Sequence, residues 1–320
     1  MHVKLSQYQR WKDFLRQKQH SNNPFFRLIF KFRSGKNAVL AKYSDEINRG
    51  RFKILSSTRL KFPLNQYKAK LHYSHQGEDG ILQEIFRRLG IEEGSYVEFG
   101  ATDGISASNT FGLLLKNWTG VYIEGDTKYF QILKENIQQN SFKGIKNASG
   151  LNIPFSPEVF RILEDNIVKK KRVQCIEAFL SLEPGSTLED ALSQTNLPRD
   201  FDLISIDIDG NDYWIWQSLQ NYQPKVVVIE YNCSFHPHES KTIPYNAQHH
   251  ADGTMHFGAS AGALYQLAKQ KGYTLVANTY SNLFFIRNDY VPGRFEALDI
   301  SRVKKTGIRN LTQKAFLDRP

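Results

Sequence analysis

Residues 201–232, FDLISIDIDGNDYWIWQSLQNYQPKVVVIEYN, contain the pattern that decides the fold. Two apolar runs, 201–208 and 224–232, have the length and the β-branched content of buried strands. The segment between them, NDYWIWQSLQ, has the length and spacing of a helix. A buried strand, a helix and a second buried strand in succession predict a parallel pair joined by a crossover helix.

The same alternation of strand and helix extends over most of the chain. Strands are predicted at 95–100, 120–125 and 144–149, with a further candidate at 173–178; helices are predicted at 77–90, 108–116, 126–139, 186–195 and 259–272. Local signals mark three helix ends: Gly90 as a stop, Asp126 or Thr127 as a cap, and Ser186–Glu189 as a capping box. Two runs at 273–280 and 281–288 predict a closing antiparallel pair. The fold class is therefore α/β, with a mostly parallel sheet and helices on both of its faces.

Charge is distributed unevenly along the 320 residues, whose formal net charge is +10. Residues 1–61 hold 15 basic and three acidic residues, a net charge of +12, so the remainder has a net charge of −2. The arm mixes its cations with aromatic residues, as in FFRLIFKFRSGK at 25–36. Such a segment suits an anionic membrane surface, a nucleic acid, or packing on the body or on a second subunit in a homo-oligomer. The nearly neutral body argues against a nucleic-acid substrate.

Composition excludes several classes of protein. A hydrophobic content of 40% and an aromatic content of 13% exclude a disordered chain. No apolar run approaches the ~20 residues of a membrane span, and the N-terminal residues lack the apolar core of a secretory signal. Cys175 and Cys233 are too few for a disulfide framework. We therefore expect a cytoplasmic protein, or one peripheral to a membrane.

Acidic residues follow each of the main predicted strands. In an open parallel sheet, ligands bind at the carboxyl ends of the strands. Glu98 precedes the loop Gly100-Ala101-Thr102-Asp103-Gly104, and Glu124 ends the next strand, where it can accept both hydroxyls of a ribose. The loop lacks the GxGxxG spacing of a dinucleotide site, and the carboxylates of Glu98 and Asp103 would repel a pyrophosphate. They suit instead the amino group and sulfonium of S-adenosylmethionine.

Five segments together resemble one known family: SHQGEDGILQEIF, YVEFGATDGISASNT, NWTGVYIEGD, FDLISIDIDGNDYWIW and VVVIEYN. They are similar to the FkbM-type branch of the class I S-adenosylmethionine-dependent methyltransferases, over roughly residues 73–288. The resemblance implies a Rossmann-like, seven-stranded sheet whose last strand is antiparallel. It implies methylation of oxygen atoms, often on sugars or other secondary metabolites. The chain then divides into a basic extension (1–70), a methyltransferase domain (71–290) with an acceptor-side insertion (231–258), and a tail (291–320).

The resemblance also implies roles for individual residues in binding the cofactor. Glu124 would hold the ribose, Gly125 and Asp126 would lie beside the adenine, and Ala148, after the third strand, would line the adenine edge. Gln76 and Glu78 would close over the methionine end. The full set of expected cofactor residues is Gln76, Glu78, Glu98, Gly100, Asp103, Gly104, Glu124, Gly125, Asp126, Ala148 and Asp207.

A hydroxyl acceptor needs a base or a metal ion, because it is a poor nucleophile near neutral pH. Asp207, Asp209 and Glu230 converge at neighbouring strand ends, where they can hold Mg²⁺ through oxygen ligands. Alternatively, one of these carboxylates or a histidine is the base. A structural alternative is that Asp209 and Asp212 only cap the next helix and its turn.

Histidines are concentrated after the fifth strand. Five of the nine lie between 236 and 256: His236, His238, His249, His250 and His256. His236 and His238 are the candidates for a base or for acceptor recognition. Metal binding and a solvated loop are the alternatives for the whole cluster.

The function expected from these features is S-adenosylmethionine-dependent O-methylation of a carbohydrate or related metabolite. Two alternatives come from other classes: an NAD-binding oxidoreductase, and a non-catalytic methyltransferase-fold module docked by its basic arm. The oxidoreductase shares the acidic end of the second strand but lacks GxGxxG.

Overall fold

The computed structural model describes residues 73–74, 76–147, 149–150, 152–250, 254 and 256–303. The predicted basic extension at 1–70, with its charged arm, lies outside the described residues. So do Ala148 and the tail from residue 304 onward. Within the described part of the chain, every helix is too short or too polar to cross a membrane.

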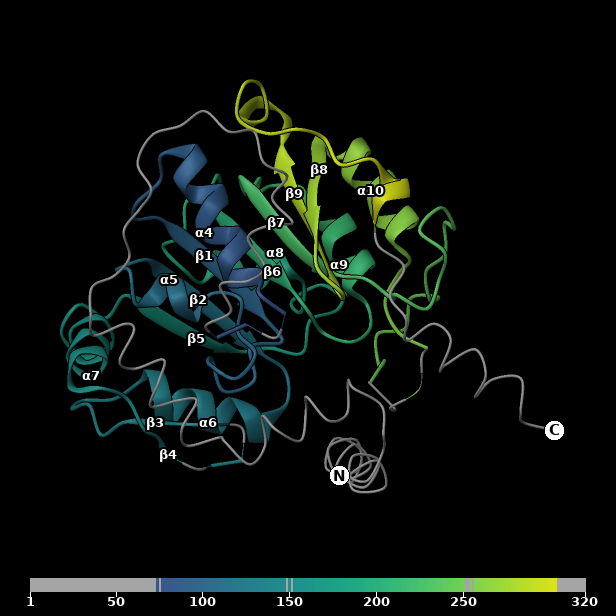
Figure 1. The fold of residues 1–320 in the computed structure, drawn as a ribbon. Helices are drawn as coiled ribbons and strands as arrows, with labels where there is room; N and C mark the ends of the chain where they lie inside the picture. The colour runs from purple at the N-terminus through teal and green to yellow at the C-terminus, as the bar shows by residue number, and fades with distance from the viewer. Residues whose placement is uncertain are drawn as a thin grey trace, which may run out of the picture.

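A seven-stranded sheet forms the centre of the molecule (Figure 1). Its strands are β1 (Ser95–Phe99), β2 (Thr119–Glu124), β5 (Val173–Glu177), β6 (Leu203–Ile206), β7 (Val226–Glu230), β8 (Tyr273–Asn278) and β9 (Asn282–Arg287). Their order in the sheet is β5-β2-β1-β6-β7-β9-β8. The first five are parallel, whereas β9 is antiparallel to both of its neighbours. The predicted sheet, mostly parallel with an antiparallel last strand, is confirmed.

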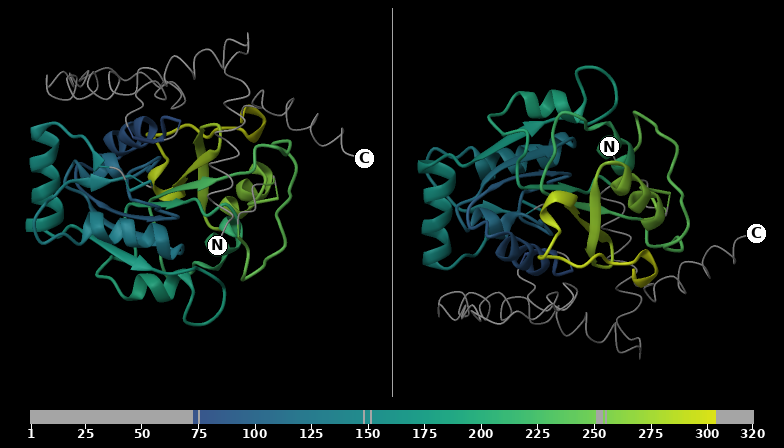
Figure 2. Two further views of the ribbon diagram at one scale, coloured as in Figure 1. Left: turned by 90° about the horizontal axis from the view of Figure 1, so that it is seen from below. Right: turned by 90° about the horizontal axis from the view of Figure 1, so that it is seen from above.

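Helices cover both faces of this sheet, as Figure 2 shows. One face packs against α4 (Glu78–Leu89), α5 (Phe111–Leu114), α6 (Thr127–Ile137) and α7 (Pro157–Leu163). The other face packs against α8 (Leu188–Ser193), α9 (Asp212–Ser218) and α10 (Ala261–Gln270). Side chains alternate between the two cores along each strand: Val226 and Val228 enter the first, Val227 and Ile229 the second. Burial on both faces explains the continuous apolar run at this strand.

The third strand of the sheet is not at 144–149, as the sequence predicted. There, β3 (Ile145–Lys146) pairs with β4 (Asn152–Ile153) in a separate two-stranded sheet. The strand beside β2 is β5, which was the further candidate at 173–178. The β3 run is only two residues long, and Ile145 is buried in the core beneath α6. Because both segments mix polar and apolar residues, only the pairing with β2 distinguishes them.

Three helix-end signals have different outcomes. Gly90 ends α4 in the left-handed conformation (φ 72°), and the Asp126 side chain caps α6 by accepting from the backbone N–H groups of Lys128 and Tyr129. The predicted capping box at Ser186–Glu189 is wrong by one residue. The box is formed by Thr187 and Asp190. Glu189 instead accepts hydrogen bonds from the segment after α9.

Candidate functional site

A cavity of about 950 Å³ lies at the carboxyl ends of the parallel strands. Its described lining residues follow those strands: 98–102, 106–109, 123–129, 178–180, 207–209 and Asn211, together with Glu230, His249 and His250. The volume is within the range of cofactor pockets, and this edge of a parallel sheet is where ligands bind.

The charge of this lining is strongly one-sided. Six carboxylates face the cavity, from Glu98, Glu124, Asp126, Asp207, Asp209 and Glu230. Among the described lining residues, Lys128 is the one lysine or arginine. A ligand with positive charge is therefore favoured over one that carries phosphates.

Glu124 is buried at the end of β2, where both of its oxygens accept backbone hydrogen bonds. Oε2 accepts from Thr102 N at 2.7 Å and Oε1 from Asp126 N at 2.7 Å. These bonds link the loop after β1 to the start of α6.

Glu98 and Asp103 are used mainly inside the loop after β1. Glu98 Oε2 accepts from the Ser108 and Thr110 hydroxyls, each at 2.6 Å, and Oε1 from Asn109 N at 2.8 Å. Burial nevertheless raises the pKa of Glu98. Asp103 is fully buried and accepts from the backbone of residues 105 and 106. Neither Asp103 nor Gly104 lines the cavity, so the structure places these two predicted cofactor residues behind its wall.

Gly100 lies where the loop after β1 meets the loop after β6. Its φ of 75° is in the left-handed region, and a Cβ built there would overlap the carbonyl oxygen of Asp207. Only glycine satisfies both conditions. The close approach at Gly100 is therefore between its backbone and the backbone of Asp207.

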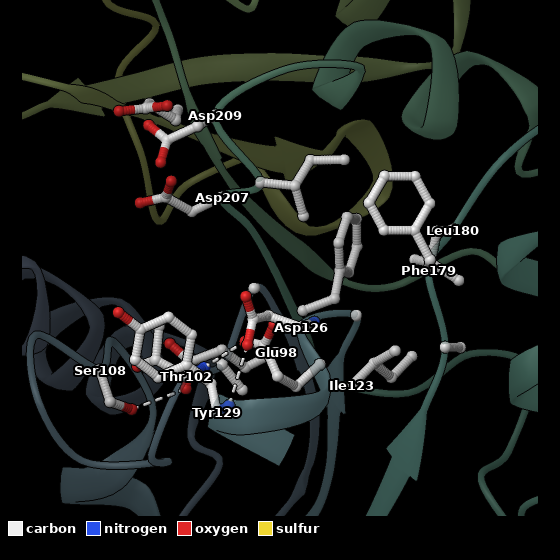
Figure 3. Close-up of a pocket in the computed structure, with 18 of the residues that line it drawn as sticks. Glu98, Thr102, Ser108, Ile123, Asp126, Tyr129, Phe179, Leu180, Asp207 and Asp209 are labelled. Carbon is white, nitrogen blue, oxygen red and sulfur yellow. Dashed lines mark hydrogen bonds between the residues drawn. The ribbon is translucent and has the colours of Figure 1, made fainter. Parts of the chain in front are cut away.

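Asp207, Asp209 and Glu230 form a carboxylate cluster at the ends of β6 and β7. Each offers an oxygen within 4.8 Å of the others. Glu230 Oε2 is buried and has no hydrogen-bond partner among the described residues. Figure 3 shows Asp207 and Asp209 side by side, with Phe179 on a different side of the cavity.

Burial and repulsion between like charges raise the pKa values of Asp207 and Glu230. Burial is the largest cause for Asp207, followed by the charges of Asp209 and Asp212. Burial and then the charge of Asp207 raise the pKa of Glu230. Three carboxylates that repel one another at this distance are a suitable oxygen donor set for a divalent cation.

Asp212 has a structural role in the turn after β6. Its Oδ1 accepts from Ile208 N and its Oδ2 from Gly210 N, both at 2.9 Å. Burial raises its pKa to about 6. The turn places Asp209 at a φ of 53°, a conformation that non-glycine residues rarely adopt. Of the predicted structural alternative, the part that concerns the turn therefore applies to Asp212, whereas Asp209 lines the cavity.

The segment after β5 lines the cavity and was missed by the sequence reasoning. Ala178 N donates to the carbonyl of Glu124 at 3.1 Å, which positions Phe179 beside Gly125. The Phe179 side chain is 40% exposed, and its ring lies 4.7 Å from that of His250. Asn147 and Ser149, which flank the predicted Ala148, do not line the cavity. The signal in the sequence was the run VQCIE at 173–177, because the strand that it forms leads directly into the lining residues 178–180.

Two predicted histidines lie outside this cavity and two others line it. The rings of His236 and His238 stack on each other at 5.4 Å, and His236 N donates to Glu239 Oε1. Neither residue is in the lining, so the structure does not bring these base candidates to the carboxylates. His249 and His250, which belong to the same sequence cluster, do line it.

Gln76 and Glu78 are also outside the lining. Glu78 is fully buried and accepts from Gln76 N at 2.7 Å and from Asn282 Nδ2 at 3.3 Å. Its charge is one of those that raise the pKa of Asp207, so it lies close to the carboxylate cluster. The structure therefore places Glu78 behind the cluster rather than over the cavity.

Comparisons with known proteins show similarity in fold only. No family model matches the chain, and no curated protein matches it. Solved structures similar to it include cofactor-bound Rv0187 from MTB (13% identity, TM-score 0.39, 68% of this chain and 83% of that one). Others are the SAH-bound Podospora anserina methyltransferase PaMTH1 (13%, 0.35, 79% and 95%) and the glycopeptide N-methyltransferase MtfA with sinefungin (12%, 0.34, 65% and 85%). Values this low assign neither a family nor an activity to this chain.

Proposed function

We propose that the protein is an S-adenosylmethionine-dependent O-methyltransferase acting on a hydroxyl of a carbohydrate or related metabolite. The observation that carries the proposal is the charge pattern of one cavity. A buried glutamate stands at the end of β2, and three closely spaced carboxylates stand at the ends of β6 and β7. A dinucleotide is disfavoured, because its pyrophosphate would meet six carboxylates and one lysine.

The end of the cavity near β2 and β5 suits the nucleoside. Glu124 would accept the ribose hydroxyls while it keeps its two backbone bonds. Gly125 and Asp126 would flank the adenine base. Phe179 would lie at the edge of the adenine. Ala148, which the sequence predicted for this role, lies outside the described residues.

The end of the cavity near β6 and β7 suits the reacting groups. The negative charge of Asp207 and Glu230 favours a sulfonium, an ammonium or a divalent cation. Glu230 Oε2, which has no partner among the described residues, is available either as a ligand of Mg²⁺ or as the acceptor of the hydroxyl proton. Asp209 would lie beside Glu230 both when the cluster binds Mg²⁺ and when Glu230 accepts the proton.

When bound, S-adenosylmethionine supplies a methyl group on a sulfonium that is already a good leaving group. The residues of this chain then have two tasks: to orient the acceptor hydroxyl and to remove its proton. The raised pKa of Glu230 makes its carboxylate a stronger base than an ordinary glutamate.

Isothermal titration calorimetry with S-adenosylmethionine tests the cofactor. We expect the wild type to bind it, and Glu124→Ala to bind at least tenfold more weakly, because two ribose hydrogen bonds are lost. Absence of binding by the wild type, or equal binding by the variant, would refute this assignment.

Chelation tests the metal ion separately. If Mg²⁺ is required, excess EDTA abolishes methyl transfer and added Mg²⁺ restores it. Methylation that persists fully in EDTA would leave a carboxylate as the base and remove the ion from the proposal.

We further propose that residues 1–61 hold the enzyme at an anionic membrane surface. Their net charge of +12 and their interleaved phenylalanines support this role. Pelleting with phosphatidylserine vesicles, with and without residues 1–61, is the test. Unchanged binding after truncation would exclude the arm as the anchor.

A further inference from the structure

A short segment of the insertion after β7, Tyr245–His250, crosses between two loops that line the cavity; we term it the strap. Leu182 N, in the segment after β5, donates to the Tyr245 hydroxyl at 2.8 Å. Asn211, in the turn after β6, donates through Nδ2 to the Asn246 carbonyl at 2.8 Å. At its far end, His250 contacts Phe179. The strap is thus attached to both sides of the pocket.

His249 packs directly on the turn that carries Asp209. A Cβ built on Gly210 would overlap the His249 ring, so the absence of a side chain there lets the imidazole reach the backbone. His249 Nε2 lies 3.3 Å from the Asp209 carbonyl oxygen. A carbonyl only accepts, so this contact requires a proton on Nε2. His249 N donates to the Asn246 carbonyl at 2.9 Å, which fixes the ring within the strap.

The direction of the Asp209 carboxylate depends on an unfavourable backbone conformation. Its φ of 53° persists only if surrounding contacts hold it. From one side, Asp212 accepts from the backbone N–H groups of Ile208 and Gly210. From the other side, His249 contacts the Asp209 carbonyl, and Gly258 N donates to the Gly210 carbonyl at 3.1 Å. A relaxed turn would carry the Asp209 side chain away from Asp207 and Glu230.

We infer that His249 is a positioning residue: it holds the Asp209–Gly210 turn so that the Asp209 carboxylate stays beside Asp207 and Glu230. The functional consequence rests on the proposed function, because it assumes that the cluster binds a cation. The inference gives the strap a second role. The segment expected to form the acceptor side of the pocket also assembles the carboxylate cluster, through a ring that contacts the backbone of the turn.

The direct test is a crystal structure of His249→Ala. We expect Asp209 to leave the left-handed region and its carboxylate to move out of the cluster. His249→Leu, which keeps bulk but cannot donate, serves as a second variant if the alanine variant fails to fold. Retention of the turn with Asp209 in place, in whichever of these variants folds, would overturn the inference.

Mn²⁺ binding, followed by the EPR signal of the free ion, supplies a functional measure. We expect His249→Ala to bind Mn²⁺ at least tenfold more weakly than the wild type. His249→Gln, whose amide can donate to the Asp209 carbonyl, should remain within threefold. Gln248→Ala, an exposed position on the same strap, is the matched control and should match the wild type.

The two measurements separate failure of the inference from failure of the proposed function. A wild type that binds no Mn²⁺ removes the cation site, whereas the crystal structure still decides whether His249 holds the turn. Equal Mn²⁺ affinity for His249→Ala and the wild type would overturn the positioning role and leave the cation site intact.

Discussion

Both ends of the cavity carry carboxylates, but those at one end accept hydrogen bonds from the protein, whereas those at the other end lie close to one another. At the ends of β1 and β2, Glu98 and Glu124 accept hydrogen bonds on both oxygens from the loop 102–110 and from Asp126. At the ends of β6 and β7, Asp207, Asp209 and Glu230 lie within 4.8 Å of one another, and one Glu230 oxygen has no partner among the described residues. The first pair stabilises the fold, whereas the second group repels itself.

This difference separates carboxylates that hold loops together through hydrogen bonds, of which Glu124 is also proposed to bind the ribose, from carboxylates that repel one another. A buried carboxylate with its hydrogen bonds made is expected to matter for stability. A carboxylate whose pKa is raised by burial and by like charges is expected to matter for binding, because a cation relieves its repulsion. The most informative variants therefore alter a carboxylate or a contact at one end of the cavity and are compared with a matched variant elsewhere.

The largest effect is expected at Gly100, where the two ends meet. Gly100→Ala would force a methyl group onto the Asp207 carbonyl oxygen, and we expect it to lower the free energy of unfolding by more than about 3 kcal/mol. Urea denaturation measures this. Gly185→Ala is the matched control: its φ is 86°, but a Cβ there meets nothing within 4 Å, so a loss of about 1–2 kcal/mol is expected. Equal losses in the two variants would contradict the close contact.

Glu98→Ala tests the hydrogen-bonded end. It leaves two hydroxyls and one backbone N–H without their acceptor, and we expect a loss of about 3 kcal/mol in the free energy of unfolding. Glu230→Gln, at the other end, should leave the stability unchanged or increase it. The comparison fails if Glu230→Gln is the more damaging of the two in the same denaturation assay.

Divalent cations test the other end by thermal denaturation. If MgCl₂ is present at about 100 times its dissociation constant, bound ion stabilises the protein by about 2.7 kcal/mol, which raises Tm by about 5–10 °C. Glu230→Gln should lose this increase. Asp126→Asn, a lining carboxylate from the nucleoside end, should keep it. An increase that survives in Glu230→Gln would place the ion elsewhere.

The smallest effect expected is a pH-dependent gain in stability for Asp207→Asn without ligand. The folded-state pKa of Asp207 is above its ordinary value, so the folded protein binds more protons than the unfolded chain between those two values. Wild-type stability therefore falls as the pH rises from about 4, whereas an asparagine escapes this loss. We expect the variant to be more stable by about 1 kcal/mol at pH 8 and equal near pH 4. Lower stability of the variant at pH 8, measured by urea denaturation, would contradict the repulsion.

Local patterns predicted the elements whose residues are buried on both faces. The runs that became β1, β2, β6 and β7 are mostly apolar, and their ends lie within two residues of the predictions. The third strand was misplaced, because both candidates, GIKNAS at 144–149 and VQCIEA at 173–178, mix polar and apolar residues and neither identifies a central strand without its partner. The choice was made by pairing with Gly120–Glu124. Ala148, predicted beside that strand, lies outside the described residues.

The site was predicted in part, and the errors have one origin. Residues directly after correctly placed strands, such as Glu124, Asp207 and Glu230, do line the cavity. The positions of the histidines depend on the course of a long loop. His236 and His238, which were predicted at the site, lie outside the lining, whereas His249 and His250 line the cavity. No local periodicity specifies how a 28-residue insertion such as 231–258 returns to the sheet.

The sequence by itself determined the alternation of strand and helix, and with it the edge of the sheet at which the acidic residues gather. Periodicity is local, and parallel strands must end on one side. Only the tertiary structure decided which carboxylates have their oxygens satisfied by hydrogen bonds and which repel one another. Their donors and neighbours come from other loops: Thr102 for Glu124, Asp207 for Glu230, His249 for the Asp209 turn. The distances between these partners follow from packing, which is why the residue type alone could not assign their roles.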